Sequence, residues 1–145
     1  MSQPESKGAA QISAAVNSGE TTALAVLDET LARIEAYDAV QPQIWISRAP
    51  AERLRAQAKN IDARIAAGDT LPLAGVPFAV KDNIDVDGFE TTAGCPAFAY
   101  TADHSAHVVA QLEAAGALCV GKTNLDQFAT GLVGTRSPFG IPANA

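Results

Sequence analysis

The spacing of apolar residues in the first part of the chain predicts an amphipathic helix. Hydrophobic side chains recur every three or four residues from position 24 to position 34, which places them on one helical face. They are Leu24, Leu27, Leu31 and Ile34. Thr21 or Thr22 provides an N-cap, because a threonine oxygen can accept a hydrogen bond from a free backbone N–H of the first turn. We expect this helix to end near Tyr37.

A second amphipathic helix is predicted between Pro50 and Gly68. Proline suits a first turn, and glycine is common just beyond a helix end. The apolar face consists of Leu54, Ala58, Ile61 and Ile65. Arg53, Arg55, Lys59 and Arg64 are expected to form a solvated face. The short β-prone segment 43–47, which follows Pro42, predicts a strand between the two helices.

After Asp69 the pattern changes to short apolar runs separated by glycine-containing connections, which indicates an α/β sheet. We predict strands at 76–80 and 117–120, with a helix between them that ends at Gly116. Ser105 is the candidate cap of that helix, and its inward residues are Val108, Val109 and Leu112. The long loop 82–100 is a candidate functional segment, because long loops in compact domains often carry function. A short helix over 125–129 is expected further on.

Composition excludes some classes of function. The 145 residues are 48% hydrophobic and 18% charged, as in a globular domain. A net charge of -6 argues against a nucleic-acid partner, since no basic stripe is available for phosphates. There is no apolar run long enough for a membrane span, and the first eight residues do not resemble a signal peptide. Cys95 and Cys119 have no pairing motif, so we expect reduced thiols and a cytoplasmic protein.

Lys81 ends the most apolar strand-like run, residues 74–80. Removing an ammonium from water is costly, and a lysine held in an apolar site is easier to deprotonate, as a general base requires. The alternative is a lysine whose stem covers apolar surface while its charge stays in water. On spacing alone this second interpretation is the more common one.

Residues 116–123 match the pattern G-x-x-x-x-G-K-[ST] of a phosphate-binding loop. That loop requires a strand before its first glycine and a helix after its lysine. Here a helix precedes Gly116, and the residues between the glycines are strand-like. Backbone N–H groups engaged in a sheet cannot hold phosphates, so we do not interpret this match as a nucleotide site.

Two other segments carry candidate chemistry. Cys95, His104 and His107 could supply zinc ligands, but they lack the four-ligand spacing of a structural site, and we favour surface histidines. The segment 123–140 is polar with apolar anchors, and its glycines would let a ligand approach the backbone closely. An irregular loop after a short helix explains it equally well.

Three stretches, 73–85, 115–129 and 127–139, resemble the amidase signature family, and the last resembles its allophanate hydrolase subgroup. Thr91, Thr92 and Ala93 fit the same pattern. The resemblance is strong from about residue 71 onward. It implies an α/β fold, here an incomplete amidase-signature fold in which N-terminal helices precede the first strands and helices of a mixed sheet. We expect a single incomplete amidase domain over 1–145, mainly helical over 1–69 and with the start of the α/β core over 70–145.

The resemblance also implies a mechanism. Lys81 matches the lysine of a Ser–cis-Ser–Lys triad, in which neutral lysine deprotonates one serine and that serine activates the nucleophile. With this role implied, we expect burial at the end of the apolar strand to desolvate Lys81 and favour its neutral form. Thr130, Gly131 and Leu132 match the loop that borders the substrate, with Gly131 as a backbone contact. The implied substrate is a small allophanate-like amide, as in urea degradation and nitrogen metabolism. The resemblance implies neither a metal nor an organic cofactor, and assembly as a homo-oligomer is left open.

The serine-rich motif of the family would follow Ala145, and Ser105 and Ser137 do not match it. His107 and Phe139 also depart from the usual threonine and tyrosine. We therefore expect a truncated hydrolase that is inactive alone. Two alternatives stay open. One is another amidase-family member, such as part of an amidotransferase that acts on aminoacyl-tRNA. The other is a non-catalytic half-domain that binds a partner.

Overall fold

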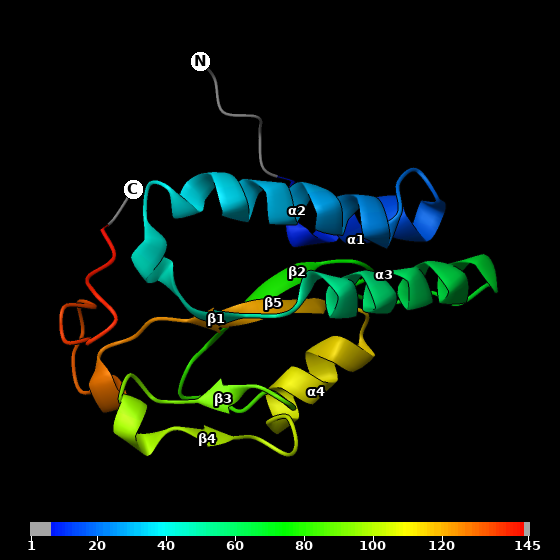
Figure 1. Ribbon diagram of the computed structural model, residues 1–145. Coiled ribbons are helices and arrows are strands. Elements are labelled where there is room, and N and C mark those ends of the chain that lie inside the picture. Colours follow the sequence, from blue (N-terminus) through cyan, green and yellow to red (C-terminus); the bar gives the residue numbers. More distant parts are fainter. Residues whose placement is uncertain (1–6, 144–145) are drawn as a thin grey trace.

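The computed structural model describes residues 7–143, in which helices flank a small mixed sheet (Figure 1). The expectations for Met1–Ser6 and for Asn144 and Ala145 lie outside the described residues. Among the described residues, no helix is long and apolar enough to cross a membrane. The elements follow one another as α1 (Ala9–Ser18), α2 (Ala23–Asp38), the 3-10 turn η1 (Pro42–Ile44), β1 (Trp45–Arg48), α3 (Ala51–Ala66), β2 (Pro77–Lys81), β3 (Glu90–Thr91), η2 (Pro96–Phe98), β4 (Tyr100–Thr101), α4 (His107–Ala114), β5 (Leu118–Thr123) and η3 (Gln127–Ala129).

The main sheet has the strand order β1-β5-β2. Central strand β5 runs parallel to β2 and antiparallel to β1. Helices α1 and α2 lie on one side of the sheet, and α4 lies on the other with the small antiparallel pair β3–β4 (Figure 1). Strand β5 is buried from Leu118 to Lys122, because it has a strand on each side and helices on both faces.

The core forms where α2 and α3 pack together and α3 meets β5. Its fully buried side chains include Leu27, Leu54 and Leu118. Burying each such leucine contributes roughly 1.5–3 kcal/mol relative to leaving it exposed. This core holds the sheet rigid, so that the loops leaving its strands have a fixed base.

The two predicted amphipathic helices are confirmed. Helix α2 begins after Thr22, whose hydroxyl oxygen accepts a hydrogen bond from the backbone N–H of Ala25 at 3.0 Å. Helix α3 follows Pro50 and buries Leu54, Ala58 and Ile61. The helical spacing therefore identified both apolar faces correctly.

Other predictions need correction. Arg53 is only half-exposed, because its guanidinium lies 5.6 Å from the centre of the Phe89 ring and donates to the carbonyl of Asp87. Ser105 does not cap α4, since its hydroxyl accepts from the backbone N–H of Asp87 at 3.0 Å. Val108 is 53% exposed rather than inward-facing. The predicted helix over 125–129 is a 3-10 turn at Gln127–Ala129.

Candidate functional site

The carboxyl ends of β2 and β5 lie side by side at one edge of the sheet. The two strands are parallel, with Lys81 opposite Thr123 and Val80 opposite Lys122. The pairing continues one residue further, because the backbone N–H of Asp82 donates to the carbonyl of Thr123 at 3.1 Å. In open α/β sheets, this edge is where ligands usually bind. The predicted catalytic residue Lys81 therefore lies at the favoured edge.

Lys81 itself is exposed, and the expectation that strand burial would desolvate it is wrong for residues 7–143. Side chains alternate between the two sides of a strand. Val80 and Asp82 are buried, at 5% and 0% exposure, whereas the Lys81 side chain between them lies in solvent. The apolar run correctly marked a buried strand. Because side chains alternate along it, however, the side chain of residue 81 lies on the opposite side from the buried side chains of its two neighbours.

The lysine that the fold buries is Lys122, in the middle of the sheet. Its side chain is fully buried, and its Nζ lies 3.0 Å from Oδ1 of Asp82, which is also fully buried. Nζ also donates to the carbonyl of Glu90 and to Oγ1 of Thr91, each at 3.2 Å. Three oxygen atoms thus surround the ammonium, as a buried charge requires. One signal of this residue is present in the sequence, a single charge at the end of the apolar segment 117–122.

Because Gly121, Lys122 and Thr123 belong to β5, the rejection of a phosphate-binding loop is confirmed. Their backbone pairs with β1 and β2 and offers no cradle of free N–H groups.

The second oxygen of Asp82 organises the loop after β3. Oδ2 accepts from the backbone N–H of Thr92 at 2.9 Å and from its hydroxyl at 2.5 Å. The Thr92 hydroxyl oxygen accepts in turn from the N–H of Gly94 at 3.1 Å. One buried ion pair therefore fixes both the end of β2 and the Thr91–Gly94 loop that accompanies it.

The same network extends to the surface through Asp85. Its Oδ1 accepts hydrogen bonds from the hydroxyls of Tyr100 and Thr91, each at 2.7 Å. The hydrogen bond from Tyr100, followed by that from Thr91, lowers the pKa of the Asp85 carboxyl below its usual value. The same bond to Asp85 raises the pKa of the Tyr100 hydroxyl. Thr91 is the link, because its oxygen accepts from Lys122 while its proton goes to Asp85.

Backbone strain concentrates beside this network. Ala93, Phe128 and Ala129 have positive φ angles of 50°, 50° and 55°, and they are the non-glycine residues with positive φ among those described. Such conformations cost roughly 1–3 kcal/mol each and often occur at functional sites. The N–H of Phe128 donates to the carbonyl of Ala93 at 2.7 Å, and the N–H of Ala93 donates to the carbonyl of Asp82 at 3.1 Å. These two bonds join the end of β2 to the segment that begins at Gln127.

The predicted substrate-binding residues follow on this segment. Thr130 is exposed, and its hydroxyl donates to the carbonyl of Gln127 at 2.8 Å. Leu132 is completely exposed. Gly131 lies against the buried carboxylate of Asp126. Hydrogen bonds through Ala93 and Phe128 thus link the end of β2, where Lys81 lies, to the segment that carries residues 130–132.

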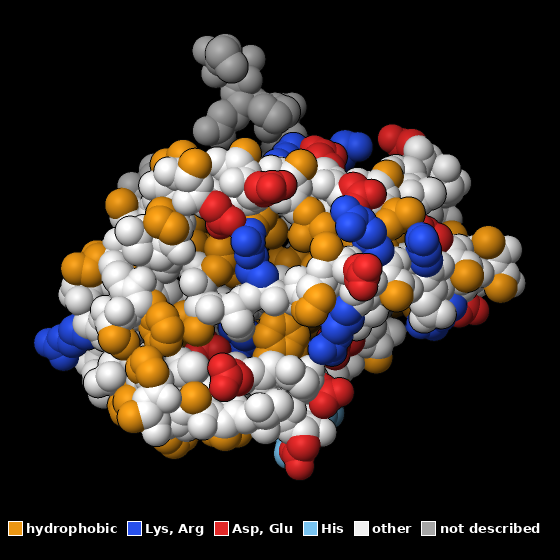
Figure 2. Space-filling view, in the orientation of Figure 1, with side chains coloured by type: hydrophobic (Ala, Val, Ile, Leu, Met, Phe, Trp, Pro, Cys, Tyr) orange, Lys and Arg blue, Asp and Glu red, His pale blue; other side chains and the backbone are white. Residues whose placement is uncertain are grey.

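Exposed aromatic rings border this edge. The Phe98 ring packs edge-on against Tyr100 and Phe128, with ring centres 5.6 and 5.4 Å apart. All three rings are at least 43% exposed. Hydrophobic side chains also gather on the corresponding lower left of the surface in Figure 2.

Neither cysteine is in a disulfide, as expected from their spacing. Burial raises the pKa of the Cys119 thiol to about 11, so it is an inert packed thiol. His104 and His107 are exposed. Within residues 7–143, no cluster of three or more histidine, cysteine or acidic side chains could hold a metal ion.

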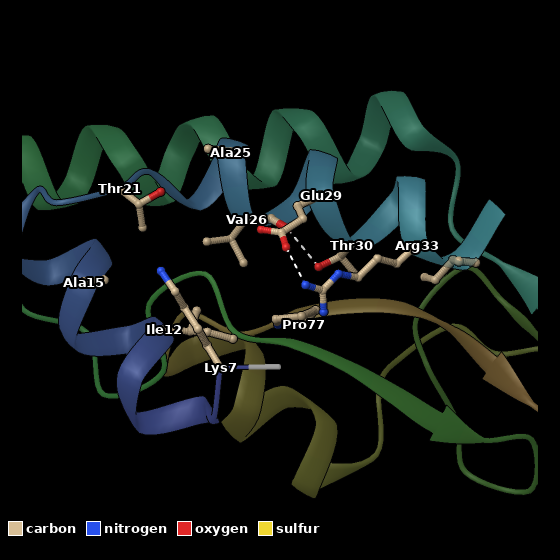
Figure 3. Close-up of a pocket in the computed structure, with 11 residues that line it drawn as sticks. Lys7, Ile12, Ala15, Thr21, Ala25, Val26, Glu29, Thr30, Arg33 and Pro77 are labelled. Atoms are coloured by element: carbon tan, nitrogen blue, oxygen red, sulfur yellow. Dashed lines mark hydrogen bonds and ion pairs between the residues drawn. The ribbon is translucent and has the colours of Figure 1, made fainter. Parts of the chain in front are cut away.

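A separate cavity of about 430 Å³ lies between α1, α2 and the start of β2 (Figure 3). Ile12, Val26 and Pro77 form its apolar wall, and an ion pair between Arg33 and Glu29 at 2.6 Å lies at one side. It contains none of the predicted site residues, so the strand edge is the better candidate site.

Comparisons with known proteins agree with the residue patterns. The sequence model of the family described as Amidase matches residues 25–145. Urea amidolyase of Saccharomyces cerevisiae is 59% identical over 96 residues, which make up 66% of this chain and 5% of that protein. The A-type subunit of glutamyl-tRNA(Gln) amidotransferase from Deinococcus radiodurans is 44% identical over 124 residues, or 85% of this chain and 25% of that protein.

The fold agrees as well. The solved structure of Kluyveromyces lactis allophanate hydrolase superposes with a TM-score of 0.70 at 41% identity, covering 92% of this chain and 22% of that one. The chain therefore spans a quarter or less of the length of these three relatives. The matches confirm the resemblance to the amidase signature family and to allophanate hydrolase, and the predicted α/β amidase fold.

Proposed function

The chain belongs to the amidase family, and on this premise we propose that it is the lysine-bearing part of a hydrolase of amide C–N bonds. The proposed substrate is a small linear amide of the allophanate type. Support comes from the similarity to urea amidolyase and allophanate hydrolase. The observation that carries the proposal is the pair of hydrogen bonds, through Ala93 and Phe128, that joins the end of the Lys81 strand to the segment bearing residues 130–132.

Lys81 is the proposed proton acceptor. A neutral lysine would take the proton of a bridging serine, which would then deprotonate the nucleophilic serine as it attacks the amide carbon. Within residues 7–143 the Lys81 ammonium makes no hydrogen bond, and its side chain is exposed. A serine-bearing segment packed on this edge would exclude water from Lys81 and favour its neutral form.

Two serines of the second half of the chain use their hydroxyls in hydrogen bonds, and the hydroxyl of Ser47, opposite Lys122 in the sheet, is buried without a partner among the described residues and out of reach of a substrate. The Ser137 hydroxyl donates to Oδ1 of Asn124 at 2.6 Å, and that of Ser105 accepts from Asp87. We therefore propose that both catalytic serines come from another segment, and that the 145 residues alone do not hydrolyse amides.

Fragment complementation tests this proposal. The chain is combined with an allophanate hydrolase that lacks the matching N-terminal part, and ammonia release from allophanate is measured. We expect activity only with both pieces, and its loss on Lys81→Met but not on Lys59→Met, which changes an exposed lysine of α3. Turnover by the chain alone, or full activity of the complemented Lys81→Met variant, would contradict the proposal.

Part of an amidotransferase is the second candidate, because the Deinococcus radiodurans protein matches a larger share of the chain than urea amidolyase does, 85% against 66%. Its lower identity, 44% against 59%, places it second. Complementation of a truncated amidotransferase, but not of a truncated allophanate hydrolase, would reverse this order. Co-purification with a serine-bearing chain without amide hydrolysis would instead favour a non-catalytic half-domain.

A further inference from the structure

The carboxylate of Asp126 binds the backbone of the segment that follows it. Oδ1 accepts from the N–H of Arg136 at 2.6 Å, and Oδ2 accepts from the N–H of Gly134 at 2.9 Å. Asp126 is only 5% exposed. Hydrogen bonds to a carboxylate are stronger than those between neutral groups, and losing a buried acceptor leaves its donors without partners.

Main-chain bonds close the same loop. The N–H of Gln127 donates to the carbonyl of Arg136 at 2.7 Å, and the N–H of Ala129 donates to the carbonyl of Asp126 at 2.7 Å. Both ends of the segment 130–136 are therefore held close to Asp126, whose side chain lies inside the turn.

Gly131 is the point of closest approach. A Cβ atom placed on Gly131 would overlap the carboxylate of Asp126. Its φ angle is not among the positive ones, so clearance rather than backbone conformation accounts for glycine here.

We propose that Asp126 is a positioning residue that holds residues 130–136 in one conformation, and that Gly131 is required because only glycine clears its carboxylate. On the proposed function, this conformation presents Thr130 and Leu132 to an amide substrate. Gly131 then acts through Asp126, in addition to any backbone contact with substrate.

The hydrogen bond from the backbone N–H of Arg136, followed by that from Gly134, also holds the pKa of the Asp126 carboxyl below its usual value. The Arg136 side chain is the charged group that acts on it, with the same sign. A carboxyl whose pKa is lowered by folding stabilises the closed loop above the unfolded-state pKa. That stabilisation is lost as the pH falls through the lower, folded-state pKa. Protonation of Asp126 in acid is therefore expected to weaken the closed loop.

Trypsin cleavage after Arg136 measures loop opening in the chain as it exists, with the cut located from fragment masses. At pH 7.5 we expect Asp126→Asn to be cut at least about tenfold faster at this bond, since cleavage follows local opening. Gly131→Ala should also be cut at least about tenfold faster than wild type at this bond, because its added methyl group would displace the Asp126 carboxylate. The matched controls are Asp103→Asn, on a side chain that is 91% exposed, and Leu132→Ala. Rates equal to wild type in both test variants would overturn the proposal.

A pH titration followed by NMR separates positioning from general support. In the wild type, the amide protons of Gly134 and Arg136 should keep their shifts down to about pH 4, where an ordinary aspartate is half protonated. Titration of both amides near pH 4 or above would overturn the proposal, even if Asp126→Asn failed to fold. Neither measurement uses a substrate, so an absence of amide hydrolysis would refute the proposed function and leave this inference standing.

Discussion

Two lysines at neighbouring strand ends have opposite environments. Lys81 ends β2 and is exposed, whereas Lys122, which belongs to β5 and pairs with Val80 of β2, is fully buried. The Lys122 ammonium contacts oxygens of Asp82, Glu90 and Thr91, while the Lys81 ammonium has no hydrogen bond within residues 7–143. One lysine is committed to holding the site together, and the other is available for chemistry.

A lysine in an apolar part of the chain can therefore have one of two roles. A buried lysine with a carboxylate and two further acceptors around it has all its donors committed to structural contacts. A lysine at an open strand end, such as Lys81, keeps its amine accessible to another segment that packs there. Burial in this chain therefore identifies the structural lysine rather than the proposed base.

The largest expected effect follows from removing the buried lysine. Lys122→Met leaves the Asp82 carboxylate buried without its ionic partner, which should lower the free energy of unfolding by about 3–5 kcal/mol. Urea unfolding followed by circular dichroism measures it. Lys59→Met is the matched control, and as a surface change it should stay within about 0.5 kcal/mol of wild type. A loss below about 1 kcal/mol for Lys122→Met would show that the pair contributes little.

A double substitution should recover part of this loss. In Asp82→Asn combined with Lys122→Met, no charge remains buried, and the oxygen of the introduced amide can still accept from Thr92. We expect the double variant to be about 1–3 kcal/mol more stable than Lys122→Met alone, a coupling typical of contacting residues. Simple addition of the two single losses would mean that Asp82 and Lys122 act independently.

The sequence predicted the helical layer well, because helix burial follows from spacing within a single element. The apolar residues of α2 and α3 were identified from their three- and four-residue intervals alone. The wrong prediction at Lys81 has a different origin. An apolar run locates a buried strand, but which residues point inward depends on register with β5 and on what covers each face.

The remaining parts of the site rest on contacts between distant residues. Asp82 meets Lys122 from another strand, and Asn124 donates to the carbonyl of Gln43 at 2.9 Å. Asp126 reaches Arg136 by a bond from side chain to backbone, which leaves no hydrophobic periodicity to detect. Family resemblance singled out Lys81 and Gly131 as candidate site residues, but only the fold shows what surrounds them.

The smallest expected effect on folding belongs to Lys81. Lys81→Met should change the free energy of unfolding by no more than about 0.5 kcal/mol, because the side chain is exposed and has no hydrogen bond to lose. In the wild type, an amine-reactive reagent should modify Lys81 readily and leave Lys122 unmodified until the chain unfolds. Mass spectrometry of peptides that contain each lysine gives both rates. Strong destabilisation by Lys81→Met, or equal labelling of the two lysines in the native chain, would remove the distinction between a structural lysine and a reactive one.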